Sequence, residues 1–326
     1  MSPLELLKTL PICRDLSDEA LTAVAALTHT AAFAPGEFLL RQGTASTCAY
    51  AIVAGQVAVL RTLPGGGELP LAEVGPGSVV GEMSLLAELP RMASARALDA
   101  VKVVVFDRAV FAAACRTRQP AARAILKGVM QRVCAHLRSL TAPLQEQAAP
   151  GPLWQPAADT PPMAEFDFRR FLPLLRCAPA LGEAGLDRLV ALAPPRLLIR
   201  GEPLLNPGTT APGLALVVHG ALESLPGTMP DAQAMEIFGP GSLVGLPTVL
   251  DGSALDWQVR AREQSLVLHL PQAAFEACFA GDDEFAFGLL RAVAEQLADS
   301  MLRLSNRLAQ NTGLQRAQTI LARRLA

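Results

Sequence analysis

The feature that most constrains this chain is an internal repeat. Residues 75 to 97 read GPGSVVGEMSLLAELPRMASARA, and residues 239 to 261 read GPGSLVGLPTVLDGSALDWQVRA. The two segments align without a gap, so that the Gly-Pro-Gly turn and Gly81 of the first fall on the same turn and Gly245 of the second. A shared pattern of turn glycines predicts that both segments adopt the same backbone path.

The two copies differ in their polar residues. The first copy carries Glu82 and Arg91, and the second has Leu246 and Leu255 at the equivalent positions. An acid and a guanidinium are thus replaced by hydrocarbon while the glycines remain. The first copy is predicted to carry functional polar side chains, and the second is predicted to have a structural role.

The repeat extends well beyond these segments. Residues 35 to 60 resemble residues 200 to 225 in their glycines and in a Gly-Glu and a Gly-Thr pair, and Phe111 matches Phe275 further along. A repeat of this length predicts two whole domains in tandem rather than a solenoid of small units.

The composition indicates a globular chain with room for both domains. Its 326 residues are 51% hydrophobic and 18% charged, which allows each half to bury a core of its own. The formal net charge of -2 and the pI near 6.1 provide no strongly basic surface of the kind that nucleic-acid-binding domains carry. Direct DNA binding is therefore not expected.

The cysteines and the N-terminus indicate a reducing compartment. Six cysteines are scattered without a CxxC pair or a neighbouring histidine cluster, so neither a zinc site nor a redox dithiol is expected. The first residues lack the basic flank and the unbroken apolar run of a signal peptide, and no segment reaches the length of a membrane span. We therefore expect a cytoplasmic protein.

The first domain is predicted to consist mainly of strands. Helical periodicity covers residues 4 to 29, with Ser17 as a cap within it. Short β-rich runs separated by glycines follow, at the spacing of a small antiparallel barrel or sandwich. These runs are FLLRQG, YAIVAGQVAVLRT, LPLAEVG and VKVVVFD.

Each domain is predicted to end in a long helix, at about residues 119 to 141 and 284 to 310. The intervening residues 142 to 164 are rich in Pro and Ala and are predicted to form a linker, which gives domains at 1–141 and 165–326. Leucines at heptad-like spacing favour pairing of the long helices. The partner is either the other long helix of the same chain or the same helix of a second chain in a homodimer.

With these elements in place, GEMSLLAELPRMASARA resembles the phosphate-binding cassette of cyclic nucleotide-binding domains. The resemblance covers about residues 5 to 140 and, in degenerate form, about 168 to 310. Such domains occur in bacterial catabolite-activator-type regulators and in regulatory subunits of cyclic-AMP-dependent kinases. The resemblance implies a mainly β fold with flanking α, made of two tandem antiparallel β-rolls of jelly-roll type, each followed by a long helix.

The chemistry of a cyclic nucleotide suits the polar residues of the first copy. The planar fork of Arg91 can donate to two phosphate oxygens at once, which Lys cannot do. Glu82 accepts hydrogen bonds only, which suits the ribose 2'-OH. Gly81 allows close backbone approach, and the amides of Met83 and Met92 are candidate additional donors, since a helix beginning near Gly81 offers unpaired N–H groups.

The nature of the base follows less directly. Met92 departs from the family, where Ala, Ser or Thr is usual, and the lack of a hydroxyl there favours cyclic AMP over cyclic GMP. The family caps the base with the helix after the roll, which makes Ser139 and Thr141 candidate hydrogen-bonding residues, with Leu137 or Leu140 as apolar cover. A helix end that simply frays is the competing interpretation.

The second copy is not expected to bind a cyclic nucleotide. Leu246 and Leu255 would leave a phosphate charge without a partner in a pocket of low dielectric, at a cost of several kcal/mol. Arg260 aligns with Arg96 and is interpreted as a solvated strand residue, and His219 and His269 as structural histidines. A nucleophile, a base and an orienting group do not occur together in either motif, so an enzyme is not expected.

The sequence thus predicts a non-enzymatic, cytoplasmic receptor for a cyclic nucleotide, with cyclic AMP preferred, that acts through a ligand-dependent interface with a separate effector protein. Residues 314 to 325 resemble the first helix of a helix-turn-helix domain, but too few residues follow for a recognition helix. Two alternatives remain. One is a scaffold or dimerisation protein with a relic nucleotide pocket, and the other is a transcriptional regulator that depends on a DNA-binding partner.

Overall fold

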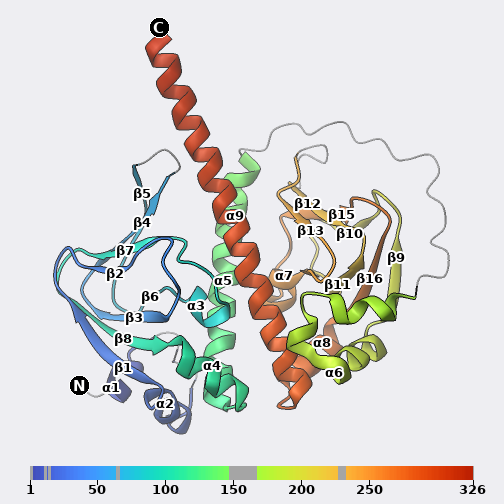
Figure 1. Ribbon diagram of the computed structural model, residues 1–326, viewed down its shortest axis with the longest axis horizontal. Helices are drawn as coiled ribbons and strands as arrows, with labels where there is room; N and C mark the ends of the chain where they lie inside the picture. The colour runs from blue at the N-terminus through green and yellow to red at the C-terminus, as the bar shows by residue number, and fades with distance from the viewer. Residues whose placement is uncertain are drawn as a thin grey trace. The chain divides into compact units, whose positions relative to one another are not determined.

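The computed structural model describes residues 3–10, 13, 16–63, 67–146, 167–226 and 233–325. The chain forms two compact units, drawn in Figure 1. The first comprises Met1–Arg132 and Ser305–Ala326, and the second comprises Val133–Leu304. The two long helices, α5 (Pro120–Glu146) and α9 (Glu284–Leu325), are each divided between the units.

This division differs from the predicted boundaries at 1–141 and 165–326, because part of each long helix packs with the other unit. Residues 142–146 of the predicted linker belong to the end of α5, and residues 147–164 lie outside the described part of the chain. α9 also continues well beyond the predicted end at residue 310.

The first unit contains two four-stranded antiparallel sheets that form the predicted β-roll. One sheet has the order β1-β8-β3-β6, and the other has the order β2-β7-β4-β5. The strands are β1 (Thr28–Phe33), β2 (Phe38–Leu40), β3 (Cys48–Ala54), β4 (Val57–Thr62), β5 (Glu68–Val74), β6 (Val79–Val80), β7 (Ser94–Ala97) and β8 (Val101–Asp107).

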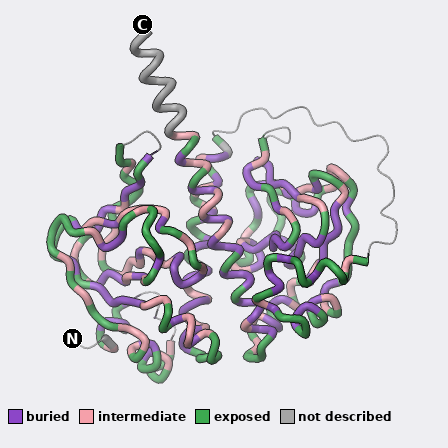
Figure 2. The backbone as a smooth tube through the Cα atoms, in the orientation of Figure 1, coloured by how far each residue is buried: buried purple, intermediate pink, exposed green. Residues whose placement is uncertain are grey.

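Apolar side chains from both sheets fill the first roll. Ala95 and Ala97 alternate with more exposed neighbours along β7, as expected for a strand with one buried face, and Figure 2 shows buried positions concentrated on such strands. The core also contains Leu39, Leu40, Ile52, Val57, Val80, Val101, Val103 and Val105. The core of the roll is therefore formed by apolar side chains of both sheets.

The helices of the first unit flank the roll. They are α1 (Pro3–Leu7), α2 (Asp18–Ala25), α3 (Met83–Leu86), α4 (Arg108–Arg116) and the first part of α5. Ser17 caps α2 as predicted, because its Oγ accepts a hydrogen bond of 3.2 Å from Ala20 N. Two short helices lie in the stretch of predicted helical periodicity over 4–29, and the periodicity extends too far, since residues 28 and 29 begin β1.

The second unit repeats the strand order of the first. Its sheets have the orders β14-β11-β16-β9 and β10-β15-β12-β13, all antiparallel. The strands are β9 (Pro195–Leu198), β10 (Pro203–Leu205), β11 (Gly213–His219), β12 (Leu222–Pro226), β13 (Glu236–Phe238), β14 (Leu243–Val244), β15 (Trp257–Ala261) and β16 (Ser265–Pro271). The helices are the 3-10 helix η2 (Phe168–Leu174), α6 (Ala178–Leu192), α7 (Leu246–Asp251), α8 (Gln272–Ala280) and most of α9 up to Leu304. The tandem β-roll fold predicted from the repeat is confirmed.

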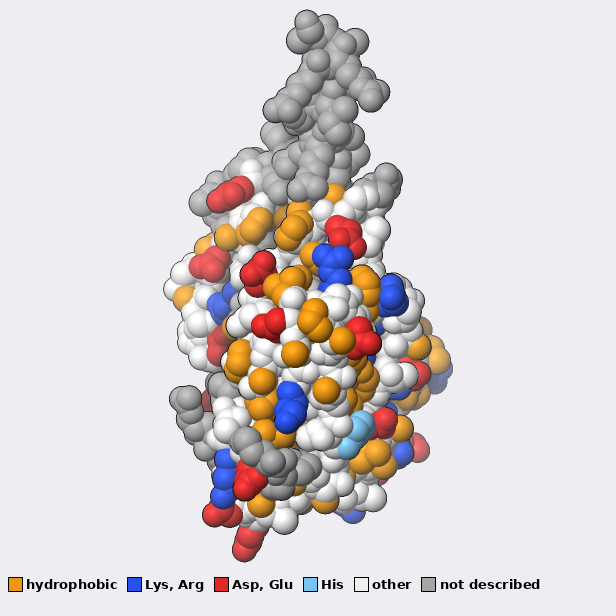
Figure 3. Space-filling view, turned by 90° about the vertical axis from the view of Figure 1, so that its left-hand side faces the viewer, with side chains coloured by type: hydrophobic (Ala, Val, Ile, Leu, Met, Phe, Trp, Pro, Cys, Tyr) orange, Lys and Arg blue, Asp and Glu red, His pale blue; other side chains and the backbone are white. Residues whose placement is uncertain are grey.

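The surface carries charges of both signs. On the face shown in Figure 3, acidic and basic side chains are interspersed among hydrophobic ones, which agrees with the net charge of -2. Among the described helices, none combines the length and the hydropathy that crossing a membrane requires.

Candidate functional site

Equivalent turns hold Arg91 in the first roll and Leu255 in the second. Gly43 N donates to Arg91 O and Arg91 N donates to Thr44 O, each at 2.9 Å. The turn at 208–209 makes the same two bonds with Leu255, at 2.8 and 3.0 Å. The backbone of the two copies is therefore equivalent at this point, and only the side chain differs.

The Arg91 side chain is buried inside the first unit, with 7% of the residue exposed. Its Nη1 donates to Gly81 O at 3.0 Å, and its Nη2 donates to Cys48 O and, at 3.7 Å, to Cys48 Sγ. Within the described residues, no carboxylate forms an ion pair with this guanidinium. Burial lowers the pKa of Arg91, while the groups of Cys48, Tyr50 and Glu82 act in the opposite direction.

Gly81 fits this site for two reasons. Its φ of +75° lies in the left-handed region, which side chains other than glycine rarely adopt. A Cβ at this position would lie 2.5 Å from Arg91 Nη1 and 3.0 Å from Leu40 Cδ1. The absence of a side chain thus leaves room for the guanidinium.

Glu82 and Met83 follow directly at the start of α3. Glu82 is half-buried, and its charge acts on Arg91, while Met83 is buried. Ser84 N and Leu85 N donate within the turn, to Gly81 O at 3.1 Å and Glu82 O at 2.9 Å. Among the described contacts, the Met83 amide has no protein acceptor, which leaves it as a donor for an anion. α3 has only four residues, so individual amides rather than a helix macrodipole would provide this donation.

Five of the predicted site residues therefore lie around one point of the first unit. Met92, half-buried, follows Arg91 and precedes β7. The group combines a buried cation, an unpaired amide and a carboxylate at the edge. These are Gly81, Glu82, Met83, Arg91 and Met92. Such a set suits an anion that also carries a hydroxyl group.

The predicted base-capping residues lie on the part of α5 that belongs to the second unit. Ser139 is exposed, and its Oγ donates to His136 O at 2.7 Å. Thr141 is buried in the second unit, where its Oγ1 donates to Arg138 O at 2.7 Å. Beyond Arg132, α5 belongs to the second unit, where Leu137 and Thr141 both line one cavity. A role of Ser139 and Thr141 in capping the base of the nucleotide stays a prediction.

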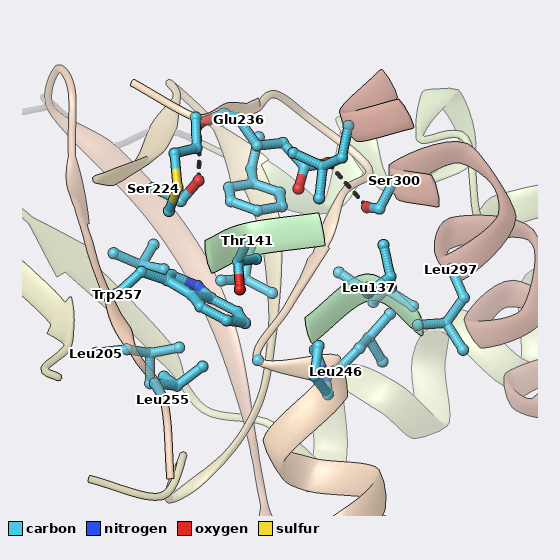
Figure 4. Close-up of a pocket in the computed structure, with 18 residues that line it drawn as sticks. Leu137, Thr141, Leu205, Ser224, Glu236, Leu246, Leu255, Trp257, Leu297 and Ser300 are labelled. Atoms are coloured by element: carbon cyan, nitrogen blue, oxygen red, sulfur yellow. Dashed lines mark hydrogen bonds between the residues drawn. The ribbon is translucent and has the colours of Figure 1, made fainter. Parts of the chain in front are cut away.

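The second roll contains an apolar cavity of about 50 Å³, shown in Figure 4. Leu246 and Leu255, which replace the glutamate and the arginine of the first copy, both line it. Figure 4 shows Leu137 and Thr141 from α5, Leu297 and Ser300 from α9, and Trp257 from β15 around the same space. Residues of both long helices of one chain thus meet at this cavity inside the second unit.

The charged groups at this cavity already have partners. Arg303 Nη2 donates to Glu236 Oε1 at 2.6 Å, and Ser300 Oγ donates to the same oxygen at 2.8 Å. Burial raises the pKa of Glu236, and Arg303 opposes this shift. The lining is apolar, and Arg303 is already paired with the Glu236 carboxylate. The cavity therefore offers a phosphate group little compensation for lost hydration.

Arg260 is not the solvated residue that the sequence indicated. Its side chain is 12% exposed, and its Nε donates to Glu223 Oε1 at 2.9 Å on the neighbouring strand. His219 is exposed, while His269 is half-buried and burial lowers its pKa. Arg260 therefore has a structural role in the sheet rather than a role as a phosphate ligand.

Sequence reasoning missed three residues of the first unit. Cys48 supplies the carbonyl and thiol that contact Arg91. Arg61 is buried at the end of β4 and donates to Asn306 Oδ1 on α9 at 2.5 Å. Arg61 occupies an inward-facing position in the alternating pattern of the run VAVLRT, so its burial could have been predicted. The sequence contains no comparable signal for Asn306.

A family model and individual relatives match this chain. The model described as "Cyclic nucleotide-binding domain" matches residues 30–118 and 195–282, which together make up more than half of the chain. The Cyclic AMP receptor protein of Thermus thermophilus is 32% identical over 110 residues, and the HTH-type transcriptional regulator Cmr of Mycobacterium tuberculosis is 28% identical over 166 residues. These alignments cover 34% and 49% of this chain. The chain spans 51% of the length of the Thermus protein and 68% of that of Cmr.

Solved structures also match. The regulatory domain of Toxoplasma gondii PKA, solved with cAMP, is 17% identical, with a TM-score of 0.32. The match covers 86% of this chain and 92% of that one. The N-terminal domain of a transcriptional regulator from Streptomyces coelicolor A3(2) is 31% identical over 39% of this chain and 91% of that chain, with a TM-score of 0.35. With the family model matched in both rolls, the chain belongs to the cyclic nucleotide-binding domain family.

Proposed function

We propose that this protein is a non-enzymatic receptor for a cyclic nucleotide, cyclic AMP in particular, and that the ligand binds in the first roll. The observation that carries this proposal is the buried guanidinium of Arg91, which has no carboxylate partner among the described residues. Burial lowers the pKa of Arg91 despite the opposing charge of Glu82, so the cation is incompletely compensated, and an anion brought by a ligand offsets that cost.

A cyclic phosphodiester fits this surrounding. Two of the N–H groups of Arg91 donate to backbone carbonyls, and the remaining donors of the fork are available to phosphate oxygens. The Met83 amide, two residues after Gly81, adds a further donor, and the Glu82 carboxylate accepts from a ribose hydroxyl. Met92, which has no hydroxyl group, supports adenine rather than guanine as the base.

The second roll is proposed to act as an interaction module. Leu246 and Leu255 fill the positions of the acid and the guanidinium, and the cavity beside them is apolar. A phosphate placed there would lose its hydration without gaining a positive partner. This roll therefore contributes packing and a surface for a partner rather than a second nucleotide site.

The output is proposed to be a changed protein interface rather than a chemical reaction. A ligand that contacts the roll and a long helix only in one arrangement shifts the equilibrium between arrangements by its difference in affinity. The names of two relatives, a cyclic AMP receptor and a transcriptional regulator, support a regulatory role. The six free cysteines fit a reducing cytoplasm, and the effector is proposed to be a separate protein.

Calorimetric titration of the full chain with cyclic AMP tests this function. We expect wild type to bind, and Arg91→Ala to bind more weakly by about 2 to 5 kcal/mol while retaining its fold. Arg91→Lys should recover little, because an ammonium cannot donate as a fork. Arg96→Ala is the matched control, since Arg96 lies on the neighbouring strand and faces Phe38. Equal affinity of wild type and Arg91→Ala, or no binding by wild type, contradicts the proposal.

A further inference from the structure

Arg61 is a charged residue on the inward face of the first roll. It follows Val57 and Val59 on β4 at the period of two that places alternate side chains on one face of a strand. Val57 belongs to the core of the roll, and Val59 packs against that core. Only 8% of Arg61 is exposed, so its guanidinium is largely removed from bulk water.

This guanidinium has a neutral partner. Its Nη2 donates to the Oδ1 of Asn306, at 2.5 Å, on the part of α9 that belongs to the first unit. No carboxylate within the described residues forms an ion pair with Arg61. Burial lowers the pKa of Arg61, as expected for a cation without compensation. An arginine has five N–H donors, and one of those of Arg61 has a partner among the described residues, so most of its hydrogen-bonding capacity is unused within that part of the chain.

A cavity of about 350 Å³ opens beside this pair. Gln42, Arg61 and Thr62 line it from the roll, and Asn306 and Gln310 line it from α9. The side chain of Gln42 is held in place at the cavity, because its carboxamide donates to Thr62 O at 3.2 Å and accepts from Thr62 N at 2.7 Å. The volume lies within the range of small-molecule pockets.

The cavity lies close to the Arg91 site within the same unit. β4 pairs with β7 so that Leu60, next to Arg61, lies opposite Ser94, three residues after Arg91. Gln42 N donates to Ser94 Oγ at 3.0 Å, and the next residue, Gly43, is bonded to Arg91 O at 2.9 Å. These bonds connect the segment that lines the cavity to the segment that carries Arg91.

Arg61 and Asn306 present a donor beside an acceptor. Because Arg61 has only donors, its hydrogen bond fixes the carboxamide of Asn306 with the oxygen towards the guanidinium. The major-groove edge of adenine carries the complementary pair, the N7 acceptor next to the N6 amino donor. The same edge of guanine carries two acceptors, N7 and O6, so O6 would face the Asn306 oxygen.

We propose that Arg61 and Asn306 together read the base of the nucleotide whose phosphate binds Arg91, with Arg61 donating to N7 and Asn306 accepting from N6. The inference rests on the proposed function and deepens it, because it assigns the selectivity for adenine to a strand of the first repeat and the terminal helix of the second.

Base analogues separate the two contacts. Calorimetric dissociation constants of the full chain are measured for cyclic AMP, for cyclic IMP, which lacks the N6 amino group, and for 7-deaza cyclic AMP, which lacks N7. We expect Asn306→Ala to weaken cyclic AMP about tenfold and not to weaken cyclic IMP, whose O6 faces the Asn306 oxygen in wild type. Arg61→Gln should weaken cyclic AMP and cyclic IMP alike, and should change the affinity for the 7-deaza analogue least.

Asn311→Ala is the matched control, because Asn311 lies on the same helix and does not line the cavity. Asn306 is exposed, so its substitution leaves the core intact, and thermal unfolding checks the fold of the Arg61 variant. If wild type binds cyclic AMP in an Arg91-dependent way but Asn306→Ala weakens cyclic AMP and cyclic IMP equally, or neither, this inference alone is overturned. If wild type binds no cyclic nucleotide, the proposed function is overturned with it.

Discussion

Arg91 Nη1 lies 3.0 Å from the carbonyl oxygen of Gly81, and a Cβ added to Gly81 would lie 2.5 Å from the same nitrogen. Arg91, the proposed phosphate ligand, therefore occupies the space that a side chain at residue 81 would need. Gly81 is thus required for two reasons: it adopts the left-handed backbone conformation, and it leaves room for the side chain of Arg91.

Gly81→Ala should therefore impair binding as well as stability. We expect the added methyl to displace the guanidinium, so that affinity for cyclic AMP falls at least tenfold, with a loss of about 1 to 3 kcal/mol in the free energy of unfolding. Gly36→Ala is the control: its φ of +86° carries the same backbone cost, but no atom lies within 4 Å of the added Cβ. Titration and urea unfolding of both variants distinguish the two effects. Unchanged affinity in Gly81→Ala would mean that the guanidinium position is not needed for binding.

Leu255 should matter for stability and not for nucleotide binding. It is 1% exposed and lines the apolar cavity, so Leu255→Ala removes buried hydrocarbon and enlarges a void. We expect the second unit to lose about 2 to 5 kcal/mol in its free energy of unfolding. Urea unfolding monitored by the fluorescence of Trp257 measures this loss. Leu98→Ala, at an exposed position, should cost little. A parallel loss of cyclic AMP affinity in folded Leu255→Ala would contradict the assignment of ligand binding to the first roll.

Arg138 and Asp251 form a forked ion pair inside the second unit. Arg138 Nε and Nη2 donate to the two carboxylate oxygens at 3.0 and 2.7 Å, and Nη1 donates to Ala254 O at 3.0 Å. We expect Arg138→Ala to lower the free energy of unfolding by about 1 to 3 kcal/mol, and Arg138→Lys to recover less than half of this loss. The exposed pair of Arg108 and Glu88 offers a comparison, since Arg108→Ala should cost under about 0.5 kcal/mol. Similar losses at Arg138 and Arg108, measured by urea unfolding, would show that the fork geometry adds nothing.

Alkaline pH should destabilise the folded protein through its buried thiols. Burial raises the pKa of Cys13 and Cys177 to about 11 and that of Cys134 to about 12, whereas an unfolded cysteine titrates near ~8.5. A raised folded pKa contributes stability that is fully present below ~8.5 and is lost as the pH rises towards the folded value. Each thiol then reduces the free energy of unfolding by up to about 1.4 kcal/mol per pH unit.

Urea unfolding between pH 8 and pH 10 measures this slope. Cys134→Ala is expected to have a shallower slope than wild type by the contribution of one thiol. The same thiols should resist iodoacetamide at pH 8 in the folded state, because a pKa of about 12 leaves only about one thiolate in ten thousand. Rapid alkylation of Cys134 in the folded protein, or identical slopes for wild type and Cys134→Ala, would show that these thiols are not protected by burial.

Much of the first site could be predicted from the sequence, because it is local. Gly81, Glu82 and Met83 are consecutive. The backbone of Arg91 is hydrogen-bonded to the turn at residues 43–44, and the second copy has the equivalent turn. The comparison of the two copies identified the residues that differ, and the structure places Arg91 and Leu255 on the same backbone scaffold. A sequence pattern suffices where chemistry depends on residues held by adjacent turns.

The sequence by itself determined the tandem rolls, the turn glycines and the identity of the polar and apolar cassettes, since period-two strands and glycine turns are encoded locally. Only the tertiary structure decided where the long helices pack. Leucines at helical spacing define an apolar face but not its partner, and for that reason Thr141 lies in the second unit and Asn306 in the first. The contact of Arg61 with Asn306 joins residues far apart in the chain, and packing rather than sequence proximity brings them together.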